Sequence, residues 1–395
     1  MILLDILLFV VVLVLAVPVA VVFVEVMAAV LLPERTLPTT TGPRAPLAVL
    51  VPAHDEALVI RATLERITAQ LQPGDRLVVV ADNCSDDTAA IARDCGAEVL
   101  VRENATLRGK GYALDHGVRH LAAAPPAAVV VVDADCDVAP GAIDKIFRQC
   151  QQFGRPVQAL YSMQVGAGNA TVSPISEFAW RLRVMVCPIG MHKLGGPCNL
   201  MGSGMAIPWP LLRDLPLASG HIVEDMKMGV DLARRGAPPM LCPQALVTST
   251  FPVSRAGAAS QRTRWEHGHL GMIVDEVPKL LRDAMRGQGA GLVPLALEIS
   301  VPPKALLLLL LLGSTVVTAL GAALGASVWP LVLAAAELTL FAVAVLLAWA
   351  RFSRDILPLS QVPRIGLYVL AKIPLYLGFL VRRQVEWVRS KRDAD

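Results

Sequence analysis

Residues 128–135 have the sequence AVVVVDAD, a run of valines that ends in two aspartates. Three earlier stretches have the same apolar character, namely LAVLVPA at 47–53, RLVVVAD at 76–82 and EVLV at 98–101. Helices are predicted between them, at 56–70, 85–95 and 109–122. Continuous apolar strands that alternate with helices are typical of a parallel sheet covered on both faces. The sequence therefore predicts an α/β domain whose ligands lie beyond the carboxyl ends of the strands.

Composition separates this domain from its surroundings. The chain has 395 residues, of which 54% are hydrophobic and only 17% are charged. Soluble domains carry about a quarter charged residues, and from residue 46 to about 285 the chain has that ordinary character. The flanking segments hold the apolar excess. A net charge of +3 and an aromatic content of 5% argue against a nucleic-acid partner.

Residues 1–32 are predicted to form an N-terminal transmembrane anchor, because the apolar run exceeds the roughly 20 residues that cross a bilayer. Arg35 and Arg44 follow the run, so the positive-inside rule places the N-terminus outside. A Pro/Thr-rich linker covers 33–45. For Glu25 we favour an interfacial position, with a functional carboxylate as the alternative.

After the domain at 46–285, hydrophobicity returns. Residues 286–303 are predicted to be interfacial, because the apolar part is too short to span and contains Glu298. Residues 304–350 are predicted to hold two transmembrane helices. Residues 351–395 are predicted to be an amphipathic or re-entrant segment at 365–381 and a basic C-terminal tail, since a crossing there would put the tail's basic residues outside.

These segments together predict a multi-pass protein of the cell inner membrane with residues 46–285 in the cytoplasm. The lipid bilayer is therefore one expected partner of the chain.

Acidic residues terminate two of the predicted strands. Asp82 and Asn83 offer hydrogen-bond partners for a base and a ribose. Asp133 and Asp135 can hold Mg²⁺ or Mn²⁺ through their carboxylates, and that cation can neutralise a diphosphate. For Asp86 and Asp87, which follow in the same loop as Asp82, helix capping is the favoured interpretation.

The sequence lacks the motifs of a dinucleotide site, a P-loop and a zinc site. The first strand is followed by Pro52-Ala53-His54-Asp55-Glu56 in place of G-x-G-x-x-G, and no Walker A motif occurs. The seven cysteines show no zinc spacing and are predicted to be small buried hydrophobic residues.

Five motifs in order carry a family resemblance. They are the Pro52 to Glu56 segment, the Asp82 strand end, Asp133-x-Asp135, Glu224-Asp225, and Gln261-x-x-Arg264-Trp265. Over about residues 46–270 the chain resembles the membrane-embedded inverting glycosyltransferases of family 2, the group of cellulose, chitin, hyaluronan and poly-N-acetylglucosamine synthases. The resemblance implies a GT-A-type domain with a parallel or mixed sheet, flanked by transmembrane helices.

The resemblance also implies a role for each matching residue. Asp225 is implied as the catalytic base with Glu224 beside it, and Asp135 as the metal ligand together with Asp133. Nucleotide-sugar binding is implied for Asp82, Asn83, Glu56, Lys110 and Asp133. Contacts to the acceptor and the diphosphate are implied for Gln261, Arg264, Trp265 and Gly204. Two positions depart from the family pattern, Asp55 where Asn is common and Val223 where cellulose synthases have Thr.

The implied function is transfer of a sugar from a nucleotide-diphosphate sugar to a polysaccharide or a lipid-linked acceptor. Three predicted transmembrane helices are few to enclose a glycan channel. This favours a lipid acceptor, or a synthase that needs partner chains or a homo-oligomer. The Gln-x-x-Arg-Trp motif favours the processive synthases instead. The alternative function is a non-catalytic scaffold of a polysaccharide export complex, and a transporter is disfavoured. His267 and His269 are candidates to line the acceptor path, and the other histidines are predicted to be structural.

Overall fold

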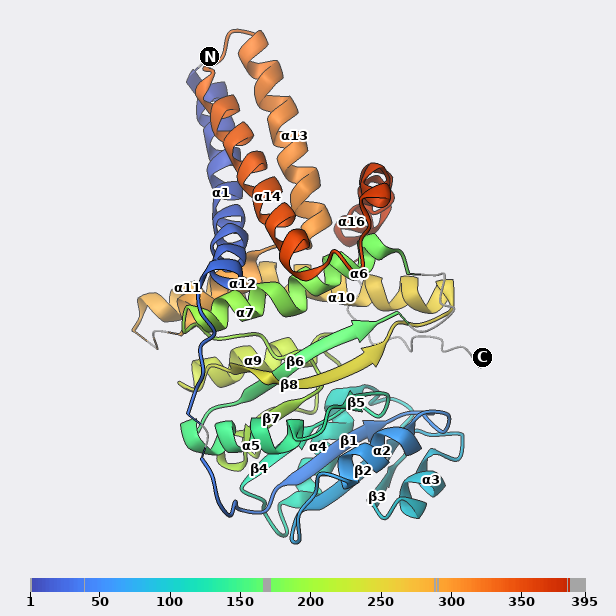
Figure 1. The fold of residues 1–395 in the computed structure, drawn as a ribbon. Helices are drawn as coiled ribbons and strands as arrows, with labels where there is room; N and C mark the ends of the chain where they lie inside the picture. Colours follow the sequence, from blue (N-terminus) through green and yellow to red (C-terminus); the bar gives the residue numbers. More distant parts are fainter. Residues whose placement is uncertain are drawn as a thin grey trace.

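The computed structural model describes residues 2–38, 40–165, 172–287, 289, 291–381 and 383. Within these residues one mixed sheet of eight strands forms the core of the domain, in the order β3-β2-β1-β4-β7-β6-β8-β5 (Figure 1). The strands are β1 (Ala48–Ala53), β2 (Arg76–Asp82), β3 (Glu98–Arg102), β4 (Ala128–Val131), β5 (Asp137–Val138), β6 (Val157–Gln164), β7 (Met205–Pro208) and β8 (Met240–Thr250).

The first four strands of this order confirm the predicted parallel sheet. β1 pairs in parallel with β2 and β4, and β2 pairs in parallel with β3. The other half is mixed, because β7 runs antiparallel to both β4 and β6. The strand predicted at 128–135 ends earlier, at Val131, because the chain turns where the backbone NH of Cys136 donates to the carbonyl of Asp133. This turn places the two aspartates at the strand end in a loop.

Helices cover both faces of the sheet, which explains why β1 and β4 are apolar throughout. One face packs on α2 (Ile60–Thr68), α3 (Thr88–Asp94) and α5 (Ala142–Phe153). The other face packs on α4 (Lys110–Leu121), α8 (Trp209–Leu212) and α9 (Glu224–Arg234). In β1, Val49 and Val51 face the first layer and Leu50 faces the second, and all three are fully buried.

A second layer of helices lies between the sheet and a bundle of long apolar helices (Figure 1). It consists of α6 (Pro174–Arg181), the π-helix η1 (Leu182–Val186), α7 (Cys187–Lys193), α10 (Arg255–Asp275), α11 (Val277–Met285) and α12 (Leu292–Ser300). The bundle contains α1 (Ile2–Leu31), α13 (Lys304–Ala323) and α14 (Trp329–Phe352). Apolar side chains of α1, α6, η1, α7, α13 and α14 form one shared core, so the bundle is anchored on this layer.

Four helical stretches in the described residues are long and apolar enough to cross a membrane, namely Ile2–Leu31, Lys304–Ala323, Trp329–Phe352 and Leu359–Val381. The last consists of the 3₁₀-helix η2 (Leu359–Arg364), α15 (Ile365–Leu370) and α16 (Ile373–Val381). The predicted amphipathic or re-entrant segment at 365–381 lies inside this stretch. Lys372, between α15 and α16, forms a buried ion pair with Glu266 of α10. The predicted basic tail lies outside the described residues except for Arg383.

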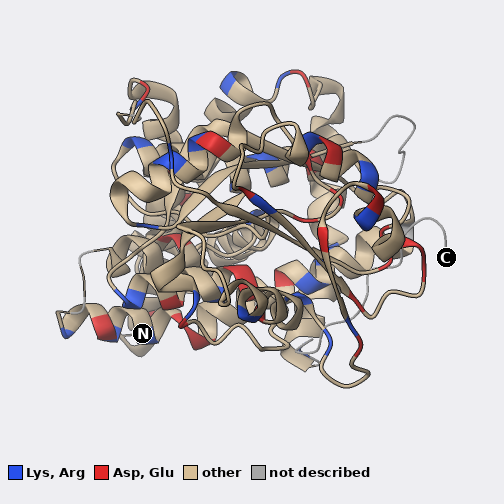
Figure 2. Ribbon diagram, turned by 90° about the horizontal axis from the view of Figure 1, so that it is seen from below, with Lys and Arg blue, Asp and Glu red and all other residues tan. Residues whose placement is uncertain are grey.

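Basic and acidic residues are interspersed over the domain in the view of Figure 2, with neither sign dominating one face of the described ribbon. All seven cysteines belong to the described residues and are free thiols, and five of them are buried.

Candidate active site

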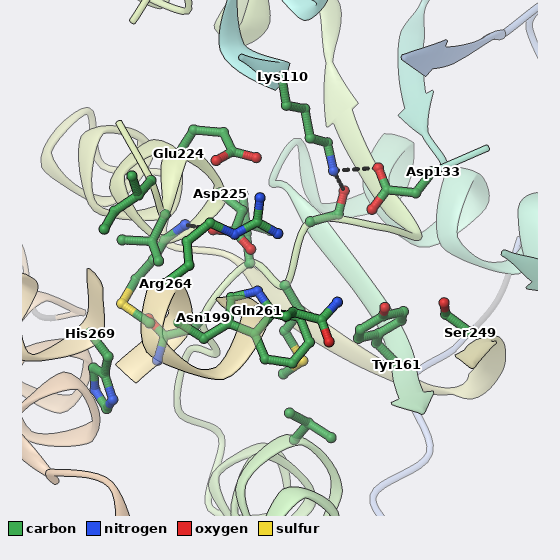
Figure 3. Close-up of a pocket in the computed structure, with 18 of the residues that line it drawn as sticks. Lys110, Asp133, Tyr161, Asn199, Glu224, Asp225, Ser249, Gln261, Arg264 and His269 are labelled. Carbon is green, nitrogen blue, oxygen red and sulfur yellow. Dashed lines mark hydrogen bonds and ion pairs between the residues drawn. The ribbon is translucent and has the colours of Figure 1, made fainter. Parts of the chain in front are cut away.

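One large cavity lies where the carboxyl ends of the strands meet the second layer of helices (Figure 3). It encloses about 330 Å³ and is lined by loops after β1, β2 and β4, by the start of α9, and by α10, η1, α12 and α1. Every site residue implied by the resemblance lines this cavity except Gly204; the lining set is Glu56, Asp82, Asn83, Lys110, Asp133, Asp135, Glu224, Asp225, Gln261, Arg264 and Trp265. Residues separated by up to 209 positions in the sequence therefore share one site.

Gly204 is a correction to the predicted set. It has a φ of +69°, and a Cβ there would lie 2.9 Å from side-chain atoms of Ala159 and Val247. This glycine serves the packing of β7 against neighbouring strands. Gly202, two residues earlier, lines the cavity instead.

Lys110 and Gly202 hold the centre of the site together. The Lys110 ammonium forms an ion pair with Asp133 and donates a hydrogen bond of 2.8 Å to the carbonyl of Gly202 (Figure 3). A Cβ on Gly202 would lie 3.3 Å from both Asp225 Oδ2 and Lys110 Nζ, and its φ of +88° favours glycine. Because Gly202 has no side chain, the carboxylates of Asp225 and Asp133 and the ammonium of Lys110 can lie around it.

The electrostatics of this centre suit a proton acceptor. Asp225 lies in the first turn of α9, where its Oδ1 accepts a hydrogen bond of 2.8 Å from the backbone NH of Met226. Burial, together with repulsion from Glu224, raises the pKa of Asp225 to about 7. Burial alone would lower the pKa of Lys110, but the carboxylates of Asp133, Glu224 and Asp225 outweigh it and raise that pKa. Lys110 therefore stays a cation beside a carboxylate that is half protonated near neutral pH.

Asp133 and Asp135 fit a divalent cation by their donor chemistry. Ligand atoms of Asp133, Asp135 and Cys136 lie within 4.8 Å of one another. Burial raises the pKa of Asp133, against the lowering effect of Lys110, so added positive charge is favourable here. The Ser249 hydroxyl donates to Asp135 Oδ2 over 3.3 Å and helps to orient that carboxylate. Carboxylate oxygens on a cavity wall are the ligands that Mg²⁺ and Mn²⁺ prefer.

Asp82 lies at the end of β2, where one of its oxygens is already engaged. Asp82 Oδ1 accepts a hydrogen bond of 2.5 Å from Arg102 Nη1 and another of 3.0 Å from Asn83 Nδ2. Asn83 itself has a φ of +53°, and its side-chain oxygen accepts from the backbone NH of Asn104. A ligand can therefore use only the second oxygen of Asp82.

Of Asp86 and Asp87, which were both predicted to cap a helix, only Asp86 makes such hydrogen bonds. Asp86 Oδ1 accepts from the backbone NH and the hydroxyl of Thr88, and Asp86 Oδ2 accepts from Ala57. Asp87, the residue that precedes α3, makes no side-chain capping bond. Asp86 is therefore structural, as predicted, and it also ties the loop after β1 to the start of α3.

The Gln-x-x-Arg-Trp motif lies on α10, with Gln261 and Arg264 directed toward the centre (Figure 3). The Nε of Arg264 is buried and has no hydrogen-bond partner among the described residues. Trp265 stacks on Trp180 of α6, with ring centroids 4.6 Å apart and planes 24° from parallel. The motif thus presents a guanidinium and an aromatic pair to the cavity.

Several lining residues were missed by the sequence analysis. They are Arg183 in η1, Asn199, Tyr161, Ser249, Lys304 and Glu298. Glu25, for which an interfacial position was favoured, lies at the domain end of α1 and also lines the cavity. Glu25 stood out in the sequence only as an isolated charge in apolar surroundings, which is the available signal. Arg183 follows Arg181 by two residues and gave no comparable signal. His269 lines the cavity, whereas His267 contacts the carbonyl of Leu375 and the ring of Phe379.

The comparisons with known proteins agree with this geometry. The family model described as glycosyltransferase like family 2 matches residues 43–268. Uncharacterized glycosyltransferases of Mycobacterium tuberculosis (strain H37Rv) and Mycobacterium bovis are each 33% identical to this chain over 144 residues. That match covers 35% of this chain and 59% of each relative, so this chain spans less than two thirds of their length.

Among solved structures, the mannosyltransferase PcManGT of Pyrobaculum calidifontis, in complex with GDP-Man and Mn²⁺, has a similar fold. The TM-score is 0.56 at 19% identity, and the match covers 94% of this chain and all of the other. The fold is therefore a GT-A-like mixed α/β sheet, as the sequence predicted. The chain belongs to glycosyltransferase family 2. The match is to the family as a whole and does not single out the cellulose, chitin and hyaluronan synthase group.

Proposed function

We propose that this protein is a membrane-bound inverting glycosyltransferase that uses a nucleotide-diphosphate sugar and a polysaccharide or lipid-linked acceptor. The observation that carries the proposal is the meeting of Lys110, Asp133 and Asp225 around Gly202. A carboxylate with a pKa of about 7 is suited to accept a proton at neutral pH. The adjacent cation and acidic pair are suited to a diphosphate.

In the proposed reaction, the acceptor hydroxyl oxygen forms a bond to the anomeric carbon while the bond from that carbon to the diphosphate breaks. Asp225 takes the hydroxyl proton, and Glu224 keeps its pKa high by repulsion. The electron pair of the broken bond leaves with the nucleoside diphosphate. A single displacement of this kind inverts the anomeric centre and needs no nucleophile from the protein.

The remaining residues bind and orient. Asp82 and Asn83 hold the nucleoside part, with Glu56 on the same wall of the cavity. Lys110 and Arg264 attract the diphosphate, since the Arg264 Nε is buried and free of a partner among the described residues. Gln261 and the stacked Trp265 form the floor on which an acceptor ring lies.

A divalent cation belongs to this proposal. Asp135 and Asp133 would hold Mg²⁺ or Mn²⁺, which would neutralise charge that develops on the leaving diphosphate. The solved mannosyltransferase with a similar fold contains Mn²⁺ and GDP-Man, so Mn²⁺ is the first ion to test.

The proposed location is the cell inner membrane with a multi-pass arrangement and the domain in the cytoplasm. The four apolar helical stretches support membrane attachment. The basic residues that follow α1 support the orientation. The finer choice between a hexosyl and an N-acetylhexosaminyl donor depends on the experiment.

The test uses the full-length protein in lipid nanodiscs with Mn²⁺ and a panel of labelled UDP- and GDP-sugars, together with membrane lipid and oligosaccharide acceptors. We expect transfer from one donor, and calorimetry should show binding of the matching nucleotide. Absence of both binding and transfer with every nucleotide of the panel would refute the proposal and favour a non-catalytic scaffold.

A further inference from the structure

The cavity also reaches the helices that connect the domain to the apolar bundle. This membrane-side end is lined by Glu25, Arg183, His269, Glu298 and Lys304. They come from the apolar helix α1, from η1, from α10, from α12 and from the first residue of α13. None of them has a task in the donor chemistry, so the end needs its own explanation.

Three polar atoms of this end are buried without a hydrogen-bond partner among the described residues. They are Glu25 Oε1, Glu298 Oε2 and His269 Nδ1. Glu25 is only 2% exposed and His269 only 5%. Leaving a buried polar group unpaired is unfavourable, and these three belong to residues that line the same cavity. A bound molecule that supplies their partners would remove that cost.

The orphan nitrogen of His269 is a hydrogen-bond acceptor. The Nε2 of His269 lies 3.0 Å from the carbonyl of Ile299, to which it must donate, and this leaves Nδ1 as the acceptor. Burial and the nearby Arg183 hold the pKa of His269 well below its usual range, so the ring is neutral. The partner of Nδ1 must therefore bring an O–H or N–H donor.

Carboxyl groups and cations face one another at this end. Glu25 and Glu298 carry the carboxyl groups, and Arg183 and Lys304 carry the cations. Arg183 is attracted by Glu298, while Lys304 faces Glu25 and Glu298. Burial raises the pKa of Glu298 to about 8, so this carboxyl group is mostly protonated at neutral pH and can both donate and accept a hydrogen bond. An uncharged hydroxyl or amide group, which also donates and accepts, matches this carboxyl group and the neutral ring of His269.

The position of Glu25 links this end to the bilayer. A Cβ on Gly190 of α7 would lie 1.9 Å from the carbonyl oxygen of Glu25, so the two helices touch backbone to backbone there. Glycine at this position lets the apolar helix α1 approach closely enough for the carboxyl group of Glu25 to reach the cavity. Val301, Pro302 and Pro303, which connect α12 to α13, lie on the same wall.

We propose that the membrane-side end binds the acceptor, and that the acceptor is a lipid with an uncharged headgroup bearing hydroxyl or amide N–H donors. The inference rests on the proposed function and names the acceptor class for it. The headgroup oxygen forms the bond to the anomeric carbon, its proton passes to Asp225, and the nucleoside diphosphate leaves with the electron pair. His269 accepts a hydrogen bond from another donor of the headgroup, and Glu25 and Glu298 form hydrogen bonds with its remaining polar groups.

The test presents the full-length protein, in phosphatidylcholine vesicles with Mn²⁺ and the labelled donor panel, with separate acceptors. These are diacylglycerol, an N-acyl amino alcohol, a glycosyl diacylglycerol, a polyprenyl phosphate and a soluble oligosaccharide. We expect product on at least one uncharged lipid. Product on the polyprenyl phosphate alone or on the oligosaccharide alone would overturn the inference. No product on any acceptor, with nucleotide binding intact, would overturn it as well.

Nucleotide binding, measured in parallel by calorimetry, separates the two claims. Loss of binding for every nucleotide refutes the proposed function, whereas binding with the wrong acceptor refutes only the inference.

Variants test the residues themselves. Glu25→Gln and Glu298→Gln keep the side-chain shape and should each raise the acceptor KM about 10- to 100-fold, with nucleotide affinity unchanged. Glu337→Gln is the matched control, because Glu337 is also a buried glutamate of an apolar helix with an unpartnered oxygen, but it does not line the cavity. An acceptor KM that equals that of the control in both variants would contradict the assignment.

Discussion

The two ends of the cavity are built from different materials. The donor end takes its side chains from loops at the ends of parallel strands and from the first turn of α9, and it contains the ion pair of Lys110 with Asp133. The membrane-side end takes its side chains from the long apolar helix α1 and from helices that touch it. Its polar atoms Glu25 Oε1, Glu298 Oε2 and His269 Nδ1 have no hydrogen-bond partner among the described residues.

This difference teaches how one cavity can serve two substrates of unlike chemistry. In the proposed function, fixed cations and carboxylates that would hold a metal face the charged diphosphate. A headgroup from the bilayer would be bound by polar groups of the helices that connect the domain to the apolar bundle. Asp225 stands between the two ends, with Glu224, Lys110 and Arg183 as its charged neighbours.

The largest expected effect comes from Asp225, where both ends meet. Asp225→Asn should lower kcat about 1,000-fold, because a positioned base contributes about 10²–10⁴-fold, while nucleotide affinity stays within a few-fold. The measurement is the rate of transfer beside calorimetric nucleotide binding. Asp231→Asn is the control, since Asp231 lies on the same helix and pairs with Lys227 outside the cavity. Full turnover of the Asp225→Asn variant would contradict the assignment of Asp225 as the base.

The next effect concerns the donor end alone. Lys110→Met removes the cation that pairs with Asp133 and bonds to Gly202. Nucleotide affinity should fall about 10- to 100-fold, with the acceptor KM unchanged. Lys145→Met is the control, because Lys145 contacts the carbonyl of Gln244 away from the cavity. Equal nucleotide affinity in the two variants would contradict the role of Lys110.

A smaller effect is expected from pH. The pKa of Asp225 is raised to about 7, so the carboxylate is ionised and able to accept a proton above that pH and is protonated below it. The kcat/KM should therefore fall about tenfold between about pH 8 and pH 6. A profile that is flat over this range, measured with saturating metal, would contradict the assignment of the base.

The smallest effect concerns the aromatic pair. Trp180→Leu removes the ring that stacks on Trp265, and the acceptor KM should rise about two- to tenfold, in keeping with about 0.5–1.5 kcal/mol for such a pair. Trp329→Leu is the control, because Trp329 is 64% exposed at the start of α14. If both variants raised the acceptor KM equally, the stack would have no specific role.

The fold and the donor end could largely be predicted from the sequence. Valine-rich strands reveal a parallel sheet by composition alone, and residues such as Asp82 and Asp133 follow these strands directly, so their place at one edge follows from topology. The exchange of Gly204 for Gly202 was not predictable, because which of two nearby glycines faces the cavity depends on the backbone path.

The membrane-side end could not be predicted from the sequence for a related reason. Glu25, Arg183 and Glu298 lie on three elements far apart in the chain, and only the packing of α1 against α7 at Gly190 brings the first of them to the cavity. A single charge in an apolar helix gives no sign of the partner that it will face. The segment at 365–381 was predicted to be amphipathic or re-entrant, and its Lys372 pairs with Glu266, a partner 106 positions away.

The division of the cavity into two ends is tested most directly by measuring nucleotide affinity and acceptor KM on the same three variants, Lys110→Met, Glu298→Gln and Glu337→Gln. The account predicts that the first changes only nucleotide affinity, the second only the acceptor KM, and the third neither. A Glu298→Gln variant that loses nucleotide affinity as strongly as Lys110→Met, with an unchanged acceptor KM, would contradict it.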